Sequence, residues 1–439
     1  MKQMKVFIYI FVTAFILSSC SIQKRCQAPE LNLPDEIIAG ENDTLTIADM
    51  SWWELYSDST LSNLIKKTLR NNRNMQAAEA HIRQMEELYR VSKASRWPTI
   101  GAQLFADHET NDYYGEKFKK SPEFSLKASL GWEIDLWGSL RWGKRKGAAE
   151  YLASVEAARA MQMTLIAETA TAYFELVALD QELEIVLQTV KTREESVNQA
   201  RLRFEGGLTS ETAYQQAQVE LASASALIPE LEQKIALKEN QIAVLAGEYP
   251  SKVERGEFDL NVSWPENIPI GLPSTLLQRR PDVRQAEQQL QAAMAAVGIA
   301  YADRFPRLTI SLVGGLENDE LKGFFESPFS YVSGNLVAPL LTFGKKKAQY
   351  KASLAAYDEK RFAYEQKVLE VFREVNDAVI TYQKKRRTSE LQLNLFEAAQ
   401  KYVDLAQLQY FNGVIRYIDV LDALSLIHIS EPTRRTPIS

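Results

Sequence analysis

Apolar and polar residues alternate without interruption from Ser125 to Leu136. Successive side chains of a β-strand point to opposite faces, so this period of two predicts one long strand. Residues 99–107 provide a partner strand, and the polar residues 108–122 provide the connecting loop. The pattern therefore predicts a β-hairpin over about 99–136. The apolar positions of its second strand are Leu126, Ala128, Leu130, Trp132, Ile134 and Leu136.

A second hairpin is predicted over about 306–342 from the same pattern. A loop is expected near 317–328, between its two strands. Each hairpin then has one apolar and one polar face. The alternating apolar positions are Leu308, Ile310 and Leu312 before the loop, and Leu336, Ala338 and Leu340 after it.

Helical periodicity occupies most of the remaining chain. Apolar residues recur every three or four positions from Leu61 to Lys93, and this helix should end before Pro98, because proline disfavours a helical conformation in the residue preceding it. Residues 140–246 predict a long helical hairpin. Its first helix, over 140–205, would extend roughly 100 Å. Gly206 and Gly207 should form its turn, and Gly247 should follow the return helix.

The chain carries the same series of motifs twice. One set recurs after 208 residues and a later set after 206, as in the shift from Gly138 to Gly344. The second copy therefore has its own long helix over 345–411, a turn at Asn412 and Gly413, and the start of a return helix. Such a duplication favours a symmetric assembly of several chains. The pairs in the first set are Glu79 and Glu287, Ala94 and Ala302, Arg96 and Arg304, Trp97 and Phe305, and Pro98 and Pro306.

The alternating strands suit a transmembrane β-barrel, in which lipid contacts one face and a polar lumen the other. A soluble, half-buried sheet produces the same alternation, so both interpretations remain open at this point. Aromatic residues favour the membrane, because rings at a common level form an interfacial girdle. The four residues that flank the hairpins are Trp97, Trp137, Phe305 and Phe343.

The N-terminus predicts export and lipidation. Lys2 and Lys5 precede an apolar stretch too short to span a bilayer, which is typical of a signal peptide over residues 1–19. The segment from Leu17 to Cys20 resembles a bacterial lipobox, so Cys20 is the expected lipid anchor of an extended leader over 20–50. An ordinary secretory cleavage is the alternative. Ser21 stands where an inner-membrane lipoprotein would have aspartate, which favours the outer membrane.

Composition excludes several functional classes. The 439-residue chain is 46% hydrophobic and 25% charged, and its net charge of −6 argues against a nucleic-acid surface. The spacing from Gly138 to Lys144 matches a phosphate-binding loop, but Arg145 replaces the required Ser or Thr. The three histidines lack metal-ligand spacing. We therefore expect no enzyme activity, no metal site and no cofactor.

The end of the chain departs from the repeat. Residues 424–439 resemble the translation of a sequencing adapter, and two prolines interrupt what should be a helix. Since the return helix of the first copy ends at Gly247, the return helix of the second copy should end near position 453. We therefore expect that residues 424–439 are not native and that the chain is truncated.

Several motifs resemble the outer-membrane efflux lipoproteins of the TolC-like superfamily, in the OprM and NodT branch that serves RND-type pumps. The resemblance covers Trp52 to Ala423. It divides the chain into a first repeat over 51–247, an equatorial linker over 248–272 and a second repeat over 273–423. The motifs are Ser51-Trp52-Trp53, the run from Trp132 to Gly138, Gly271-Leu272-Pro273-Ser274, Arg280-Pro281-Asp282, and the run from Tyr417 to Ala423.

The resemblance implies an α+β membrane protein that exports drugs or other small molecules. A homotrimer would form a twelve-stranded β-barrel in the outer-membrane lipid, with four strands from each protomer, continuous with a long periplasmic α-helical barrel. The partners would be a periplasmic adaptor protein and an inner-membrane RND transporter. The helical tips that meet the adaptor fall on Gly207, Leu208, Thr209, Gly413, Val414 and Ile415.

The same resemblance implies a periplasmic gate, with an aspartate ring at Asp422 and an apolar ring at Ile418. These residues are i and i+4, so one helical face carries both. Ser425 stands where this branch has an arginine. Asp422 as an ordinary exposed acid is the alternative to the gate. For the whole protein, the alternative function is a non-conducting lipoprotein that spans the periplasm as a scaffold.

Overall fold

A computed structural model describes residue 29 and residues 58–111, 119–256, 277–420 and 422–423. These residues belong to two compact units. The first contains residues 80–157 and 280–368, and the second contains 58–79, 158–256, 277–279 and 369–423. The predicted signal peptide, Cys20 and the leader lie outside the described residues, as do most of the predicted linker over 248–272 and the tail over 424–439.

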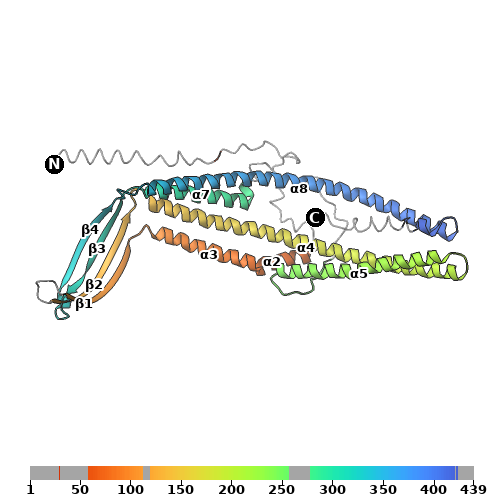
Figure 1. Ribbon diagram of the computed structural model, residues 1–439, viewed down its shortest axis with the longest axis horizontal. Coiled ribbons are helices and arrows are strands. Elements are labelled where there is room, and N and C mark those ends of the chain that lie inside the picture. The colour runs from red at the N-terminus through yellow and green to blue at the C-terminus, as the bar shows by residue number, and fades with distance from the viewer. Residues whose placement is uncertain (1–28, 30–57, 112–118, 257–276, 421, 424–439) are drawn as a thin grey trace. The chain divides into compact units, whose positions relative to one another are not determined.

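The first unit contains an antiparallel sheet of four strands in the order β1-β2-β3-β4, which lie side by side in chain order (Figure 1). The strands are β1 (Thr99–Asn111), β2 (Lys119–Ile134), β3 (Arg307–Asn318) and β4 (Pro328–Val337). A short 3-10 helix, η3 (Phe324–Glu326), lies between β3 and β4.

The loop predicted over 108–122 is wrong at both ends. Strand β1 continues to Asn111 and β2 begins at Lys119, so only residues 112–118 lie outside the described strands. Pro122 lies within β2 although proline cannot donate a hydrogen bond to a neighbouring strand. At this point β2 pairs only with β1, since the pairing between β2 and β3 starts at Phe124. Proline is tolerated where a strand has a free edge.

Two helices in the first unit pack through one very close contact. Helix α7 (Pro281–Ala302) places Gly298 against the indole of Trp142, which belongs to α4 (Ser139–Glu205). A methyl group at Gly298 would overlap that ring. Helix α7 also forms a core with α8 (Lys345–Phe411). The buried members of this core are Leu290, Val297, Tyr350 and Tyr357.

The second unit packs α2 (Ser59–Asn71) and α5 (Glu211–Leu245) against α4. Leu61 and Ile65 of α2 lie in one core with Tyr173 of α4. Leu176 of α4 and Ile242 of α5 lie in a second core, and both side chains are fully buried. Tertiary packing of these apolar residues therefore stabilises the helices.

The single helix predicted over 61–93 is in fact two helices, α2 and α3 (Arg73–Ala94). The break lies at Asn72, whose backbone has a ψ of 127°. The Asn72 side-chain oxygen accepts hydrogen bonds from the N–H groups of Asn74 and Met75, which caps α3. Its side-chain nitrogen donates to the carbonyl of Leu245, at 2.9 Å. This long-range hydrogen bond holds the break in place.

Corresponding helices in the two repeats have the same lengths. Helices α3 and α7 each have 22 residues, and α4 and α8 each have 67. The glycines that precede the long helices, Gly138 and Gly344, both have φ of 82°. Those that follow them, Gly207 and Gly413, have φ of 68° and 73°. Only glycine adopts such values without steric cost.

Candidate functional site

One face of the sheet is apolar across all four strands. The register places Leu130 opposite both Ile100 and Leu312, and Leu312 opposite Val332. Many of these side chains are exposed in the single chain. The exposed fraction is 80% for Ile100 and 78% for Leu104. A continuous exposed apolar patch marks contact with lipid or another protein. The strand alternation predicted from sequence thus becomes a two-dimensional apolar surface.

The opposite face of the sheet is polar. Lys127 lies there, and its ammonium group forms a 2.8 Å ion pair with Glu317 of the neighbouring strand. The ammonium group also lies over the ring of Phe329 at 5.8 Å. Ser125, on the same face, is completely buried. The sheet therefore separates an apolar surface from a polar one.

Two of the four predicted girdle residues come together. The rings of Trp137 and Phe305 are stacked, with centroids 4.5 Å apart. The Trp137 indole N–H donates to the carbonyl of Pro306 at 2.6 Å. The side chains of Trp97 and Phe343 are instead 71% and 99% exposed. Phe343 has a φ of 44°, a left-handed value that is strained for a residue other than glycine.

The predicted tips are helix ends closed by the same hydrogen-bond pattern. The N–H of Leu208 donates to the carbonyl of Arg203, and that of Val414 donates to Gln409. With the left-handed glycine before each, these are Schellman caps. Leu208 and Val414 are both more than 70% exposed, at 73% and 71%. Each hairpin therefore ends in a glycine turn that carries an exposed apolar side chain.

The remaining tip residues are less accessible. Thr209 and Ile415 are half-buried, and Ile415 packs on a small core made by α8 and the segment that follows it. The buried members of that core are Val403, Ala406, Val420 and Ala423.

Both predicted gate residues lie on the exposed side of the last described helical turns. Residues 417–420 and 422–423 are helical, and the carboxylate of Asp419 accepts from the N–H of Arg416 at their start. Tyr417 and Val420 are buried, whereas Ile418 is 43% exposed and Asp422 is exposed. Ile418 and Asp422 thus share the face that is turned away from the packed side.

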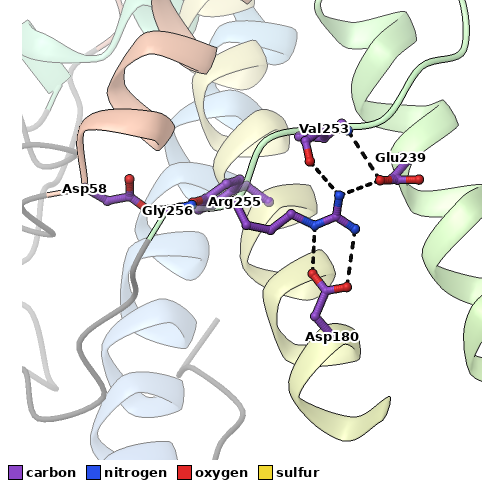
Figure 2. Close-up of polar contacts among 7 residues, drawn as sticks. Asp58, Asp180, Glu239, Val253, Arg255 and Gly256 are labelled. Carbon is purple, nitrogen blue, oxygen red and sulfur yellow. Dashed lines mark hydrogen bonds and ion pairs between the residues drawn. The ribbon is translucent and has the colours of Figure 1, made fainter. Parts of the chain in front are cut away.

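Tyr173 and Arg255 belong to a polar cluster in the second unit, and Figure 2 shows the side chain of Arg255 reaching Asp180 and Glu239. The Tyr173 hydroxyl donates to Asp58 at 2.7 Å and accepts from the N–H of Gly256 at 2.9 Å. Arg255 donates to both carboxylate oxygens of Asp180, on α4, and to Glu239, on α5. The cluster joins four segments of the chain.

Burial and hydrogen bonding shift the pKa values of two side chains in this cluster. Burial raises the pKa of the Tyr173 hydroxyl well above its usual value, and the hydrogen bond to Asp58 adds to the effect. The hydrogen bonds to Asp180 and Glu239 raise the pKa of the Arg255 guanidinium. Sequence reasoning missed this cluster. Tyr173 and Asp58 are separated by 115 positions, and neither residue stands out in the local pattern.

A second missed polar group lies near the start of the final helix. Arg193 of α4 is buried, and its guanidinium approaches the carboxylate of Glu220, on α5, at 3.5 Å. Burial raises the pKa of the nearby Tyr417 hydroxyl, while the positive charge of Arg193 opposes that rise. Tyr417, in the last described helical segment, thus lies beside α4 and α5.

Among the residues that the structure describes, no three histidine, cysteine, aspartate or glutamate side chains are grouped so that they could hold a metal ion. In the same part of the chain, no helix is both long enough and apolar enough to cross a membrane.

Comparisons with known proteins identify the family. The family described as "Outer membrane efflux protein" matches residues 64–248 and 272–428. Antibiotic efflux pump outer membrane protein ArpC of Pseudomonas putida is 28% identical over 425 residues, which cover 94% of this chain and 88% of ArpC. Probable outer membrane lipoprotein SilC of Salmonella typhimurium is 28% identical over 435 residues, with 96% and 92% covered.

A solved structure agrees with the sequence comparisons. The outer-membrane channel OprN superposes with a TM-score of 0.85 at 26% identity, over 93% of this chain and 95% of OprN. The expected resemblance to outer-membrane efflux proteins is therefore confirmed, with the family match over residues 64–248 and 272–428. This chain belongs to the outer membrane efflux protein family.

Proposed function

We propose that this protein is the outer-membrane channel subunit of a tripartite efflux pump. The exposed apolar face of the sheet is the observation that carries the proposal, because a face of this kind is stable only against lipid or another apolar surface. Membership of the outer membrane efflux protein family supports the same conclusion. The polar face, with Lys127 and Glu317, would line the lumen.

A homotrimer is the proposed assembly. Strands β1 and β4 lie at the two ends of the sheet, and each has one edge that no other described strand pairs with. Three copies would supply twelve strands, and closing them into one barrel would pair every edge. The helices would extend into the periplasm as a helical barrel.

The predicted tips, gate, lipid anchor and interface aromatics each have a proposed role in this assembly. The tips at Leu208 and Val414 would contact a periplasmic adaptor protein, which would connect the channel to an inner-membrane RND transporter. Ile418 and Asp422 would form the periplasmic gate. Cys20 would carry the lipid anchor. Trp97, Trp137, Phe305 and Phe343 would lie near the membrane interface.

The proposed cargo consists of drugs or other small molecules. ArpC is described as part of an antibiotic efflux pump, and TtgC of Pseudomonas putida as part of a toluene efflux pump. CusC of Escherichia coli is described as part of a cation efflux system. The pumps to which these relatives belong are thus named for chemically different cargo. The tunnel of this chain would accept many compounds, and the inner-membrane partner would select among them.

Conductance tests the proposal. Protein purified from outer-membrane fractions should run as a heat-modifiable trimer and should produce single-channel currents in planar lipid bilayers. A scaffold lipoprotein would produce no currents. Stable trimers that fail to conduct, at any applied voltage and after removal of gate charge, would contradict the channel function.

A further inference from the structure

The four connections between the sheet and the helices of the first unit lie at one end of the sheet (Figure 1). Thr99, at the start of β1, lies opposite Gly131, near the end of β2. Arg307, at the start of β3, lies opposite Val337, at the end of β4. The chain segments at these connections therefore lie near one level of the unit. We call them the junction segments, and they are residues 93–98, 135–146, 303–307 and 342–351.

The junction segments are strongly basic. They contain twelve lysines and arginines and only two acidic residues, Asp135 and Asp303, in a chain whose net charge is −6. Residues 317–328, where β3 leads into β4 at the other end of the sheet, contain four acidic residues and one lysine. The excess of positive charge thus belongs to one end of the second hairpin.

Carboxylates within the protein neutralise little of this charge. Asp135 pairs with Arg141 at 3.1 Å, and Asp303 pairs with Arg307 at 2.8 Å. Within the described part of the chain, Lys146 is the one further junction cation that has a carboxylate partner. The other cations leave a concentrated positive charge, which attracts anions from outside the protein.

Helix stability does not account for the basic residues at the start of α8. Lys345, Lys346 and Lys347 occupy its first turn, which contains no acidic residue. The helix macrodipole disfavours positive charge at this end of a helix. Lys345 and Lys347 are exposed. These positions therefore suit the binding of an external anion better than they suit the helix itself.

Two junction arginines are held in place by aromatic rings. The guanidinium of Arg304 lies over Tyr301 at 5.4 Å and over Tyr350 at 5.3 Å. That of Arg145 lies over Trp142 at 4.6 Å. Both arginines are exposed. Stacking occupies the flat face of a guanidinium, so the N–H groups at its edge remain suited to bidentate hydrogen bonds with phosphate oxygens.

Each junction segment has the same order of side chains from the sheet toward the helix. An aromatic residue comes first and a basic residue follows it. Beyond the apolar strands, this is the order in which a bilayer presents its interface and then its headgroup phosphates. The order therefore indicates lipid as the source of the anion. The pairs are Trp97 with Arg96, Trp137 with Arg141, Phe305 with Arg304, and Phe343 with Lys345.

We propose that the junction segments bind the headgroups of anionic glycerophospholipids, such as phosphatidylglycerol, in the leaflet that faces the periplasm. The lysines neutralise the phosphate charge, the arginines donate hydrogen bonds to its oxygens, and the aromatic rings contact the glycerol region. A zwitterionic lipid binds more weakly, because its own ammonium group is repelled by the junction cations. This inference rests on the outer-membrane channel proposed above, with its helices on the periplasmic side.

Lipid binding by the purified trimer tests the proposal. The protein in detergent is titrated with dioleoyl phosphatidylglycerol or with dioleoyl phosphatidylcholine, and native mass spectrometry counts the bound lipids. Phosphatidylglycerol should bind about tenfold more tightly. Raising the NaCl concentration from about 0.1 M to about 0.5 M should reduce this preference, because salt screens the attraction between phosphate and the junction cations.

Variants that neutralise charge locate the site. The triple variant Arg96→Gln, Lys345→Gln and Lys347→Gln should bind phosphatidylglycerol about tenfold more weakly and phosphatidylcholine as before. The charge-conserving triple variant Arg96→Lys, Lys345→Arg and Lys347→Arg should bind both lipids like the wild type. The matched control removes three exposed charges elsewhere on α8 and should also bind normally. Its substitutions are Lys384→Gln, Lys385→Gln and Lys401→Gln.

Each outcome decides a definite point. Equal binding of the two lipids, a preference that salt leaves unchanged, or an equal loss in the control variant would overturn the proposal. Displacement of phosphatidylglycerol by the same concentration of glycerol 3-phosphate would indicate a site for soluble anions and would overturn the assignment to lipid. If the neutralised variant formed no trimers, the salt titration of the wild type would still decide.

The measurements also separate this inference from the proposed function. Trimers that conduct in planar bilayers but show no preference for phosphatidylglycerol would overturn the lipid site and leave the channel function standing. A protein that is absent from outer-membrane fractions would overturn both.

Discussion

The hydroxyl of Tyr173 connects parts of the second unit that are far apart in the chain. It donates to the Asp58 carboxylate that caps α2 and accepts from the N–H of Gly256. Arg255, the neighbour of Gly256, then reaches α4 and α5 through Asp180 and Glu239. Tyr173 and Asp180 of α4 and Glu239 of α5 thus hold Arg255 and Gly256 against these helices.

Tyr173→Phe should lower the free energy of unfolding by about 1–3 kcal/mol at pH 7, because it leaves a buried carboxylate oxygen of Asp58 and the N–H of Gly256 without this partner. The raised pKa favours the neutral hydroxyl in the folded protein. Its contribution is therefore complete below about pH 10 and is lost as pH rises above that value.

Denaturant unfolding, followed by helical circular dichroism at several pH values from 7 to 11, measures the loss of stability and its dependence on pH. The wild type should lose stability above pH 10 more steeply than Tyr173→Phe. Tyr249→Phe is the control, because Tyr249 is 92% exposed. Equal alkaline slopes in the wild type and Tyr173→Phe would contradict the assignment.

At the scale of elements, long helices acquire their positions from a few close contacts. The contact between Gly298 of α7 and Trp142 of α4 is the tightest helix-to-helix approach among the described glycines. By contrast, an added Cβ at Gly143, the next residue after Trp142, would meet no atom within 4 Å. Gly298 is therefore the position to test, and Gly143 is its control.

Gly298→Ala should destabilise the protein, whereas Gly143→Ala should stabilise it. Both changes improve helix propensity by about 0.5–1 kcal/mol. Only the first forces the Trp142 ring to move, at a cost of about 1–3 kcal/mol. The unfolding midpoints of the two variants provide the test. If Gly298→Ala were as stable as Gly143→Ala, the close contact between α7 and α4 would contribute nothing to stability.

The hairpin tips should bind the adaptor through their apolar side chains. Replacing Leu208 and Val414 with glutamate should weaken association with the adaptor at least tenfold, since both sites would present a charge to an apolar contact. Trimer formation and conductance should remain unchanged. Surface plasmon resonance with the purified adaptor measures the affinity. Leu321→Glu, at another exposed leucine, should bind normally; equal loss in this control would place the contact elsewhere.

At the scale of the whole molecule, the trimer would bring three copies of Asp422 to one axis. Asp422→Ala should raise single-channel conductance several-fold, because cations bound between the three carboxylates would no longer obstruct the passage. The effect should shrink as salt concentration rises. Asp404→Ala removes a charge of the same sign from exposed α8 and should change conductance little. Unchanged conductance in Asp422→Ala would exclude this residue from the gate.

Local sequence determined those features that depend on neighbouring residues. Alternation from Ser125 to Leu136 indicated the strand that the structure has as β2. The pairs Gly206-Gly207 and Asn412-Gly413 indicated the turns after α4 and α8. The shifts of 208 and 206 also appear in the bounds of corresponding helices. Strand period, helix period and left-handed turns arise from backbone sterics, so a short window of sequence contains enough information to predict them.

Tertiary structure alone decided the features that depend on distant partners. The helix break at Asn72 needs the carbonyl of Leu245, and the extra strand length around Pro122 needs an edge that the pattern cannot reveal. The Tyr173 cluster and the pairing of Trp137 with Phe305 likewise join residues from separate segments. Burial and hydrogen bonding across the fold set these contacts, and their free energies depend on positions that no local pattern encodes.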